Sequence, residues 1–170
     1  MQESGNRKDE LGSLKPQKRH PALVPLSHDH HEGLIAAQRL KRAAPAYRDC
    51  DDAALSITLL WERELEFHFR QEEEQLFGLE TGEKLAEMIR RALEEHAAMR
   101  AMVDECRSGA TDEELIRRFG GMLERHIRFE ERELFPALQE HLSVEALERI
   151  GAAILEERRN GGPVRGCVIR

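Results

Sequence analysis

The sequence predicts an all-α protein: an up-and-down antiparallel four-helix bundle with a short extra C-terminal helix. The 170 residues are 40% hydrophobic and 35% charged but only 5% aromatic, which is typical of a soluble helical protein. Apolar residues recur every three or four positions through four long segments. Short connections join these segments, so neighbouring helices should run antiparallel with their apolar stripes buried against one another.

The prediction divides the chain into three regions. Residues 1–25 mix charges with Gly, Ser and three prolines and show no apolar period, which indicates a flexible N-terminal arm. Residues 26–142 hold the four helices of the bundle, and residues 143–170 hold the extra helix and a tail.

Capping residues and helix breakers mark the first two helices. Ser27 is expected to cap the first, which Pro45 ends. Asp51 or Asp52 is expected to cap the second, which stops at Gly78. Residues between these helices are expected to lie in a loop, including Tyr47 and Cys50.

Similar signals bound the remaining helices. The third is expected to close near Gly109. The letters TDEE form a capping box for the fourth, in which Thr111 accepts from the amide of Glu114 and the Glu114 carboxylate reaches back. Pro136 should end or kink this helix, and Ser143 should cap the fifth.

Charge and composition limit the classes of function. The formal net charge of −7 argues against nucleic-acid binding, which needs a basic face, and gives no reason to expect binding to an anionic membrane. No apolar run approaches the roughly 18 to 20 residues that span a bilayer, and the first twenty residues do not read as a secretory signal. We therefore expect a cytoplasmic protein whose three cysteines are reduced thiols.

A ten-residue segment occurs twice. HFRQEEEQLF, starting at His68, returns as HIRFEERELF, starting at His126. Each copy places a histidine and a glutamate four residues apart, on one face of a helix. His68 and Glu72 fall on the apolar stripe of the second helix, and His126 and Glu130 fall on that of the fourth. The predicted inward row of the second helix is Ala54, Thr58, Trp61, Leu65, His68, Glu72 and Leu76.

The first and third helices each add a histidine to their apolar stripes. His96 interrupts an otherwise apolar row in the third helix. In the first helix, His30 is in phase with Leu34 and Ala37 and is the expected inward residue. His31 lies on a mixed face and is the second choice.

This set of buried polar residues predicts a metal site. Two carboxylates and four imidazoles in an apolar space are costly unless something neutralises them. A histidine and a glutamate at i and i+4 can hold one cation, and two such pairs on facing helices would let both carboxylates bridge two cations. A mixed imidazole and carboxylate set suits iron, and would accept manganese or zinc. The alternative is a buried polar network without metal.

The second glutamate of each repeat points to the side of its helix. For Glu73 and Glu131 we expect a solvated helix face, and the alternative is a hydrogen bond to an imidazole N–H behind the metal.

These residues resemble those of the hemerythrin-like (HHE) cation-binding family over residues 26–142. The matching motifs are DHHEGL, HFRQEEEQLF, EEHAAM and HIRFEERELFP, in that order. The resemblance implies an up-and-down four-helix bundle around a non-haem di-iron centre, with Glu72 and Glu130 as bridging carboxylates. It also implies four terminal ligands, namely His30, His68, His96 and His126.

Two departures from the oxygen-carrying members bear on function. Where those members have a second histidine in the third helix, this chain has Arg100. Their fourth helix carries an aspartate five residues after its histidine, whereas Glu130 follows His126 by four. One iron would therefore keep water or open positions, which counts against reversible oxygen carriage and permits small-ligand or peroxide chemistry.

The sequence thus leaves three functions open. The first is a metal-binding protein whose di-iron centre binds or senses O2, NO or iron, with metal ions and a small diatomic molecule as its partners. The second is a di-iron oxidoreductase that acts on peroxide or NO. The third is a helical interaction module whose metal is structural or absent.

Overall fold

The computed structural model describes residues 18–43, 50–79 and 81–161, and it is helical with no strand in these ranges. The all-α prediction is confirmed. A 3₁₀ turn precedes the first helix, and π-helical segments interrupt two of the later ones. The elements are η1 (Pro21–Leu23), α1 (Val24–Ala43), α2 (Cys50–Leu60), η3 (Trp61–Leu65), α3 (Glu66–Gln75), α4 (Glu83–Arg107), α5 (Glu113–Phe129), η4 (Glu130–Leu134), α6 (Phe135–His141) and α7 (Val144–Gly161).

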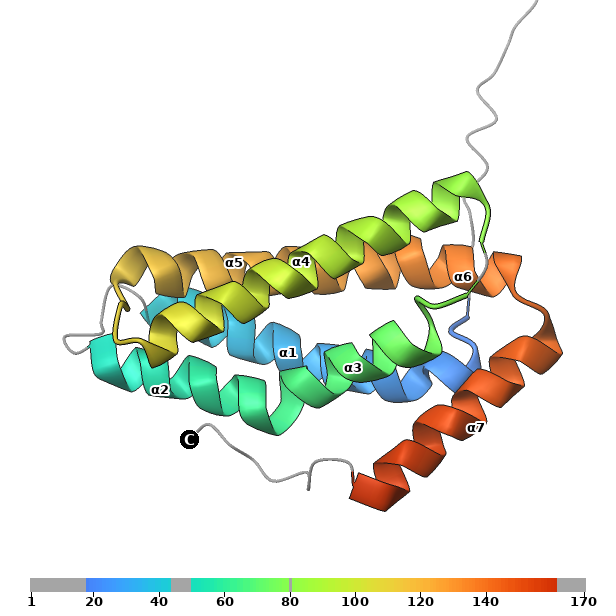
Figure 1. Cartoon of the computed structure of the whole chain (residues 1–170), viewed down its shortest axis with the longest axis horizontal. Helices are drawn as coiled ribbons and strands as arrows, with labels where there is room; N and C mark the ends of the chain where they lie inside the picture. Colours follow the sequence, from blue (N-terminus) through green and yellow to red (C-terminus); the bar gives the residue numbers. More distant parts are fainter. Residues whose placement is uncertain (1–17, 44–49, 80, 162–170) are drawn as a thin grey trace, which may run out of the picture.

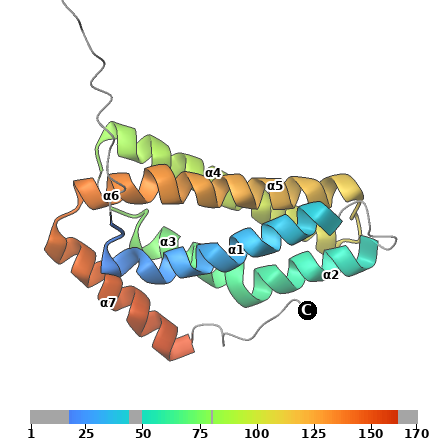
Figure 2. The same cartoon turned by 180° about the vertical axis from the view of Figure 1, so that it is seen from behind.

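The long helices lie lengthwise beside one another. Figure 1 shows α1, the α2–α3 helix, α4 and the α5–α6 helix running along the molecule in alternate directions. Seen from behind in Figure 2, α1 packs along α5, and α7 lies obliquely across one end. Helix α7 packs against η1 and α3. None of the helices in the described ranges is long and apolar enough to cross a membrane.

The first helix begins earlier than predicted. It starts at Val24 rather than after Ser27, and the preceding turn η1 is capped by His20, whose Nδ1 accepts from the Ala22 amide at 3.3 Å. Ala22 and Leu23, in the turn between Pro21 and Pro25, are both buried. Their burial favours helical structure before Ser27. Residues 18–25 of the expected flexible arm are therefore described and partly packed, while residues 1–17 lie outside the described residues.

The predicted N-cap of the fourth helix is wrong, and of the two outcomes predicted at Pro136, an end or a kink, the end is wrong. Asp112, not Thr111, is the N-cap of α5, since its Oδ1 accepts from the Leu115 amide at 2.7 Å. Aspartate caps a helix as well as threonine does, so a shift of one residue costs little. The helix also continues past Pro136, which lies in the first turn of α6 directly after η4, where a missing N–H is tolerated. At the start of α7 the Ala146 amide donates to Ser143 Oγ at 3.2 Å, as predicted.

The π-helical segments change which residues face inward. A π turn holds extra residues and so rotates the helix face that follows it. Upstream of η3 the buried row is Ala53, Ile57 and Leu60, whereas the predicted Ala54 and Thr58 are only half-buried. The predicted row was therefore out of phase in α2, and it becomes correct from Trp61 onward. Cys50, expected in a loop, begins α2, and Tyr47 lies outside the described residues.

A buried polar layer separates two apolar clusters. On α4, Ala92 belongs to one cluster and Met99 to the other, with His96 between them. On α1, Leu26 and Ala37 belong to different clusters in the same way. Apolar packing above and below the layer fixes the helices around it.

Candidate metal centre

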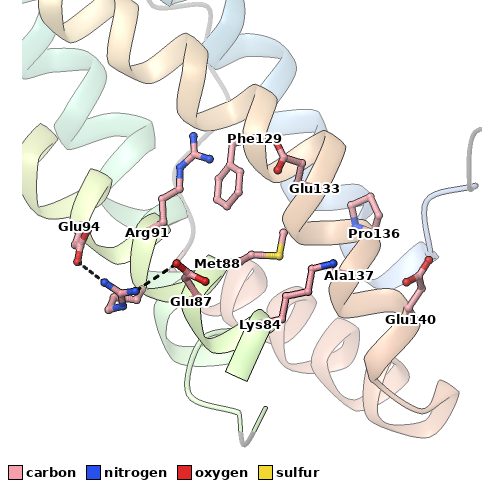
Figure 3. Close-up of a pocket in the computed structure, with 11 residues that line it drawn as sticks. Lys84, Glu87, Met88, Arg91, Glu94, Phe129, Glu133, Pro136, Ala137 and Glu140 are labelled. Atoms are coloured by element: carbon pink, nitrogen blue, oxygen red, sulfur yellow. Dashed lines mark ion pairs between the residues drawn. The ribbon is translucent and has the colours of Figure 1, made fainter. Parts of the chain in front are cut away.

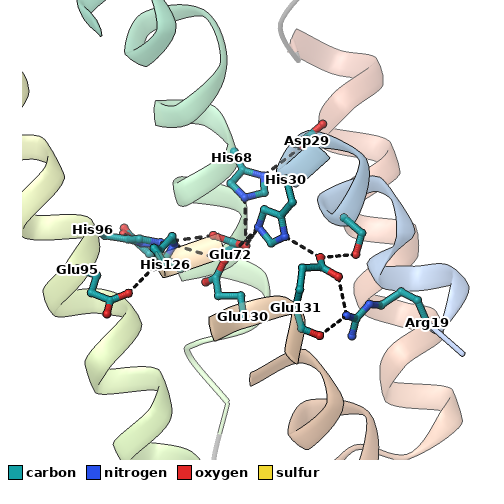
Figure 4. Close-up of polar contacts among 12 residues, drawn as sticks. Arg19, Asp29, His30, His68, Glu72, Glu95, His96, His126, Glu130 and Glu131 are labelled. Carbon is teal, nitrogen blue, oxygen red and sulfur yellow. Dashed lines mark hydrogen bonds and ion pairs between the residues drawn. The ribbon is translucent and has the colours of Figure 1, made fainter. Parts of the chain in front are cut away.

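All six predicted site residues meet in this layer (Figure 4). Each lies on a helix or a π segment, and each is at most 3% exposed. They are His30 on α1, His68 and Glu72 on α3, His96 on α4, His126 on α5 and Glu130 at the start of η4.

The six residues form two overlapping groups. The first group is His30, His68, Glu72 and Glu130, and the second is Glu72, His96, His126 and Glu130, with the ligand atoms of each group within 4.8 Å of one another. Both glutamates belong to both groups. Two histidines are specific to each, and we call these the His30/His68 half and the His96/His126 half.

In the His30/His68 half, the Nε2 atoms face the carboxylates. His30 Nε2 lies 3.0 Å from Glu130 Oε2 and 3.5 Å from Glu72 Oε1. His68 Nε2 lies 3.2 Å from Glu72 Oε1. Atoms about 2.1 Å from one ion lie about 3.0 to 3.4 Å apart at octahedral or tetrahedral angles, so these separations fit donors around a single cation.

The His96/His126 half has the same pattern. His96 Nε2 lies 3.5 Å from Glu72 Oε2, the second oxygen of that carboxylate, and His126 Nε2 lies 3.3 Å from Glu130 Oε2. The two Nε2 atoms are 3.0 Å from each other. Glu72 therefore offers one oxygen to each half, as a bridging carboxylate requires.

Several buried atoms of the layer have no hydrogen-bond partner. They are Nε2 of His30 and of His68 and all four carboxylate oxygens of Glu72 and Glu130. A buried polar atom without a partner costs about 1 to 3 kcal/mol, more if charged. Because these atoms share one space, cations bound there would satisfy all of them, and the residues therefore fit a metal centre.

The outer nitrogen of every site histidine contacts a carboxylate. Because a carboxylate can only accept, each Nδ1 must carry the proton, which leaves Nε2 as a donor atom for metal. The contacts are His30 to Glu131 at 2.7 Å, His68 to Asp29 at 3.2 Å, His96 to Glu73 at 2.7 Å and His126 to Glu95 at 2.9 Å.

These four carboxylates form a closed ring around the layer. Each acid contacts a histidine on the next helix along the chain, and the last acid contacts a histidine on the first helix. The contacts run from α1 to α3, from α3 to α4, from α4 to α5, and from η4 back to α1. Each acid is the sequence neighbour of an inward residue, so it points about 100° to the side. Asp29 and Glu95 precede their inward residues, whereas Glu73 and Glu131 follow theirs. Viewed from one end of the bundle, antiparallel helices turn in opposite senses, so all four acids point the same way around the layer.

The ring overturns one expectation and adds two residues. Glu73 and Glu131 do not lie on a solvated face; both contact imidazoles of the layer. Sequence reasoning missed Asp29 and Glu95 altogether. The signal was present in DHHEGL and EEHAAM, where an acid precedes His30 and His96. Nothing in the period of one helix, however, shows that such an acid reaches the histidine of its neighbour.

An arginine contacts each acid of the ring from outside. Arg19 Nη2 donates to Glu131 at 2.7 Å, and Arg100 Nη2 donates to Glu73 at 3.0 Å. The other two contacts are Arg91 Nε to Glu95 at 3.0 Å and Arg158 to both oxygens of Asp29.

Charge pairing controls the pKa values of the ring acids. Burial alone would raise the pKa of Asp29, but hydrogen bonds with His68 and Arg158 lower it to about 2. Likewise, burial opposes ionisation of Glu131, while its hydrogen bonds with His30 and Ser27 bring its pKa to about 2. The ring acids therefore stay ionised at neutral pH.

The imidazoles shift in the opposite direction. Burial lowers the pKa of His96, but the nearby carboxylates of Glu72 and Glu73 outweigh it and raise that pKa to about 9. The pKa of His30 is raised well above its usual value by Glu130 and Glu131, again against burial. Without metal, protons on these rings would balance the carboxylates, and a bound cation would have to displace them.

Aromatic rings close the layer. Phe69 stacks on His96 with ring centroids 3.8 Å apart, and Phe135 stacks on His30 at 5.3 Å. Both phenylalanines are at most 1% exposed, so they exclude water and hold the imidazole planes.

The remaining histidines lie away from the layer. His31, the second choice on α1, is exposed, which leaves His30 as the inward residue. His28 and His141 are also exposed.

Comparison with protein families agrees with this geometry. The family model of the hemerythrin HHE cation binding domain matches residues 21–138, well over half of the chain. The chain belongs to this family. Searches of curated proteins and of solved structures returned no significant match. The hemerythrin match covers all six layer residues and the four ring acids, but it ends before α7 and begins after Arg19.

Proposed function

We propose that this HHE domain is an up-and-down four-helix bundle that binds two iron ions bridged by Glu72 and Glu130, and that this centre binds or senses O2, NO or iron. The observation that carries the proposal is the sharing of both glutamates by two four-residue groups, with all four of their oxygens left without hydrogen bonds.

The donor set favours iron among the common metals. Each half offers two imidazole nitrogens and a share in two carboxylates, whereas calcium and magnesium prefer oxygen alone. Manganese or zinc would fit the same atoms. Four protein groups for each ion would leave coordination positions free, and iron held there would supply binding of small diatomic molecules and electron exchange.

The chain's own residues prepare the layer for this chemistry. The ring acids hold the Nδ1 protons, so the Nε2 lone pairs point inward. Phe69 and Phe135 keep water out, which strengthens electrostatic interactions within the layer. The four arginines neutralise the ring acids, so that the charge of Glu72 and Glu130 remains to be balanced by cations.

The surface pocket shown in Figure 3 is separate from this chemistry. It has a volume of about 660 Å³ between α4 and the η4–α6 segment, and none of the six layer residues lines it. Arg91 links it to the centre, because its guanidinium carbon lies 3.8 Å from the centroid of the Phe129 ring and its Nε donates to Glu95.

The experiment is anaerobic loading of metal-free protein with ferrous iron, followed by exposure to O2 or NO and absorption spectroscopy. Wild-type protein should develop near-ultraviolet and visible bands, and Glu72→Ala should not. His141→Gln, at an exposed position, is the matched control and should behave as wild type. Catalytic consumption of peroxide or NO with a reductant would instead assign an oxidoreductase. If Glu72→Ala developed the same absorption bands as wild-type protein, the proposal would be contradicted.

A further inference from the structure

The two halves of the centre are braced from different parts of the chain. The His96/His126 half is backed by Arg100 and Arg91, which both lie on α4 within the bundle. The His30/His68 half is backed by Arg19, before η1, and by Arg158, on α7.

Arg158 on α7 contacts two residues that adjoin the centre, Asp29 and Gln71. Its Nη1 donates to Asp29 Oδ1 at 3.2 Å and its Nη2 donates to Asp29 Oδ2, the oxygen that also contacts His68 Nδ1. Its Nε donates to Gln71 Oε1 at 2.9 Å. Gln71 is fully buried and directly precedes Glu72. One guanidinium therefore fixes the acid behind His68 and the residue beside a bridging carboxylate.

Gln71 returns the contact to α7. Its Nε2 donates to the Ile154 carbonyl at 3.2 Å and to Glu157 Oε2 at 3.1 Å. The docked α7 thus both covers the Gln71 amide and supplies the hydrogen bonds that a buried amide needs.

Arg19 performs the same task for His30. Its Nη2 donates to the backbone carbonyl of Glu131 at 2.8 Å and to Oε2 of the same residue at 2.7 Å. Its Nη1 donates to Gln139 Oε1 at 3.3 Å. Glu131 is thereby held against His30 Nδ1 through its other oxygen.

The segments that carry these arginines pack on each other. A Cβ added at Gly151 of α7 would lie 2.9 Å from the Ala22 Cα, so only glycine allows this approach. Leu23 and Ile154 belong to the same apolar cluster. We call residues 19–23 together with α7 the terminal clamp.

We propose that the terminal clamp positions the His30/His68 half of the centre, with Arg158 and Arg19 as its positioning residues. This inference rests on the proposed two-cation centre. It makes the two cation sites unequal, because one is braced within the bundle and the other depends on Arg19 and α7, which lie outside the matched residues. Loss of a partner behind a metal-ligating histidine typically costs about 10- to 100-fold in metal affinity. Releasing the clamp loosens those partners and should impose a loss of up to that size, chiefly on the His30/His68 half, since Gln71 also lies beside Glu72, which both halves share.

The test is titration of metal-free, full-length protein with Co²⁺, whose absorption bands report each site, with Zn²⁺ competition to obtain affinities. Arg158→Gln should weaken one of two sites by about 10- to 100-fold. Arg100→Gln, the matched variant behind His96, should weaken the other. Arg158→Lys, which keeps the charge but not the fork, should fall between wild type and Arg158→Gln.

Histidine backgrounds assign the sites. In a His96→Ala background, where the His30/His68 half remains, Arg158→Gln should still cost about 10- to 100-fold. In a His68→Ala background it should change the remaining affinity less than about threefold, since contacts that are not shared add independently. Equal losses in both backgrounds would overturn the inference.

Two further measurements guard against a general folding defect. Gly151→Val should undock α7 by collision with Ala22 and reproduce the site-selective loss. Because coupling is reciprocal, Co²⁺ should slow amide hydrogen exchange in α7 of wild-type protein, but not of His68→Ala. Exchange in α7 that is indifferent to Co²⁺ would overturn the inference while leaving the two-cation centre intact. Wild-type protein that binds no cation would overturn the proposed function, and the inference with it.

Discussion

Glu131 directly follows Glu130 in sequence, yet its Oε1 lies 2.7 Å from Nδ1 of His30, on a different helix. One residue faces the centre, and the next residue in the chain orients a histidine on the neighbouring helix. The same relation recurs at Asp29, Glu73 and Glu95, so the layer is organised by four helices that each hold the next.

Removing one ring acid should weaken metal binding without unfolding the protein. We predict that Glu131→Ala lowers the affinity of the His30/His68 half by about 10- to 100-fold, because His30 loses the acceptor that fixes its tautomer. Glu133→Ala, at an exposed position on the same π segment, is the control. The measurement is competition with a chelator of known affinity. Equal affinities for the two variants would refute this role of Glu131.

Metal removal should lower thermal stability. Metal-free protein keeps Glu72 and Glu130 buried with unsatisfied oxygens, whereas each bound ion stabilises the folded state by about 2.7 kcal/mol at a free concentration near 100 times its Kd. For a chain of this size we expect Tm to fall by roughly 5 to 10 °C for each ion removed. Differential scanning calorimetry of metal-loaded and stripped protein tests this, and an unchanged Tm would argue that the layer is a metal-independent polar network.

The metal-free protein should also lose stability as the solution becomes alkaline. The pKa of His96 is raised to about 9 in the folded state, so its protonated form contributes stability that is complete below its usual pKa of 6.5 and is lost as pH rises through about 9. Urea denaturation between pH 6.5 and 9.5 should show the decline. His96→Gln should flatten it, and a wild-type curve that is level over this range would contradict the assignment. The same proton competes with metal, so metal affinity should rise with pH.

Two adjacent glycines on α5 should respond oppositely to alanine. A Cβ at Gly120 would lie 3.0 Å from the Ala37 carbonyl oxygen, where α1 crosses closely, and we expect Gly120→Ala to destabilise by about 1 to 3 kcal/mol. At Gly121 the nearest atom is the flexible end of Arg125, at 3.3 Å, so Gly121→Ala should stabilise by about 0.5 to 1 kcal/mol through helix propensity. Free energies of unfolding from urea titrations test the pair, and matching signs would show that the α1–α5 approach is looser than described.

Sequence patterns predicted the residues of the layer better than its surroundings. His68, Glu72, His96, His126 and Glu130 could be found because helical periodicity alone decides whether a side chain faces inward. The same argument chose His30 over His31, which is exposed. These assignments needed no knowledge of how the helices pack.

Features that depend on packing between segments could not be predicted in this way. The π segment at Trp61 shifts the face of α2, and a single-period pattern continued past it misplaces Ala54 and Thr58. The contact of Asp29 with His68 needs the relative rotation of two helices. Arg158 reaches Asp29 across 129 positions of sequence, and no local pattern carries that information.

The most direct test of the central claim is the iron content per chain of protein loaded anaerobically and freed of loose metal, measured by elemental analysis beside a Glu72→Ala, Glu130→Ala double variant. The two overlapping groups predict close to two irons per chain for the wild type and close to none for the double variant. One iron or fewer in folded wild-type protein, or equal loading of both proteins, would contradict a carboxylate-bridged pair.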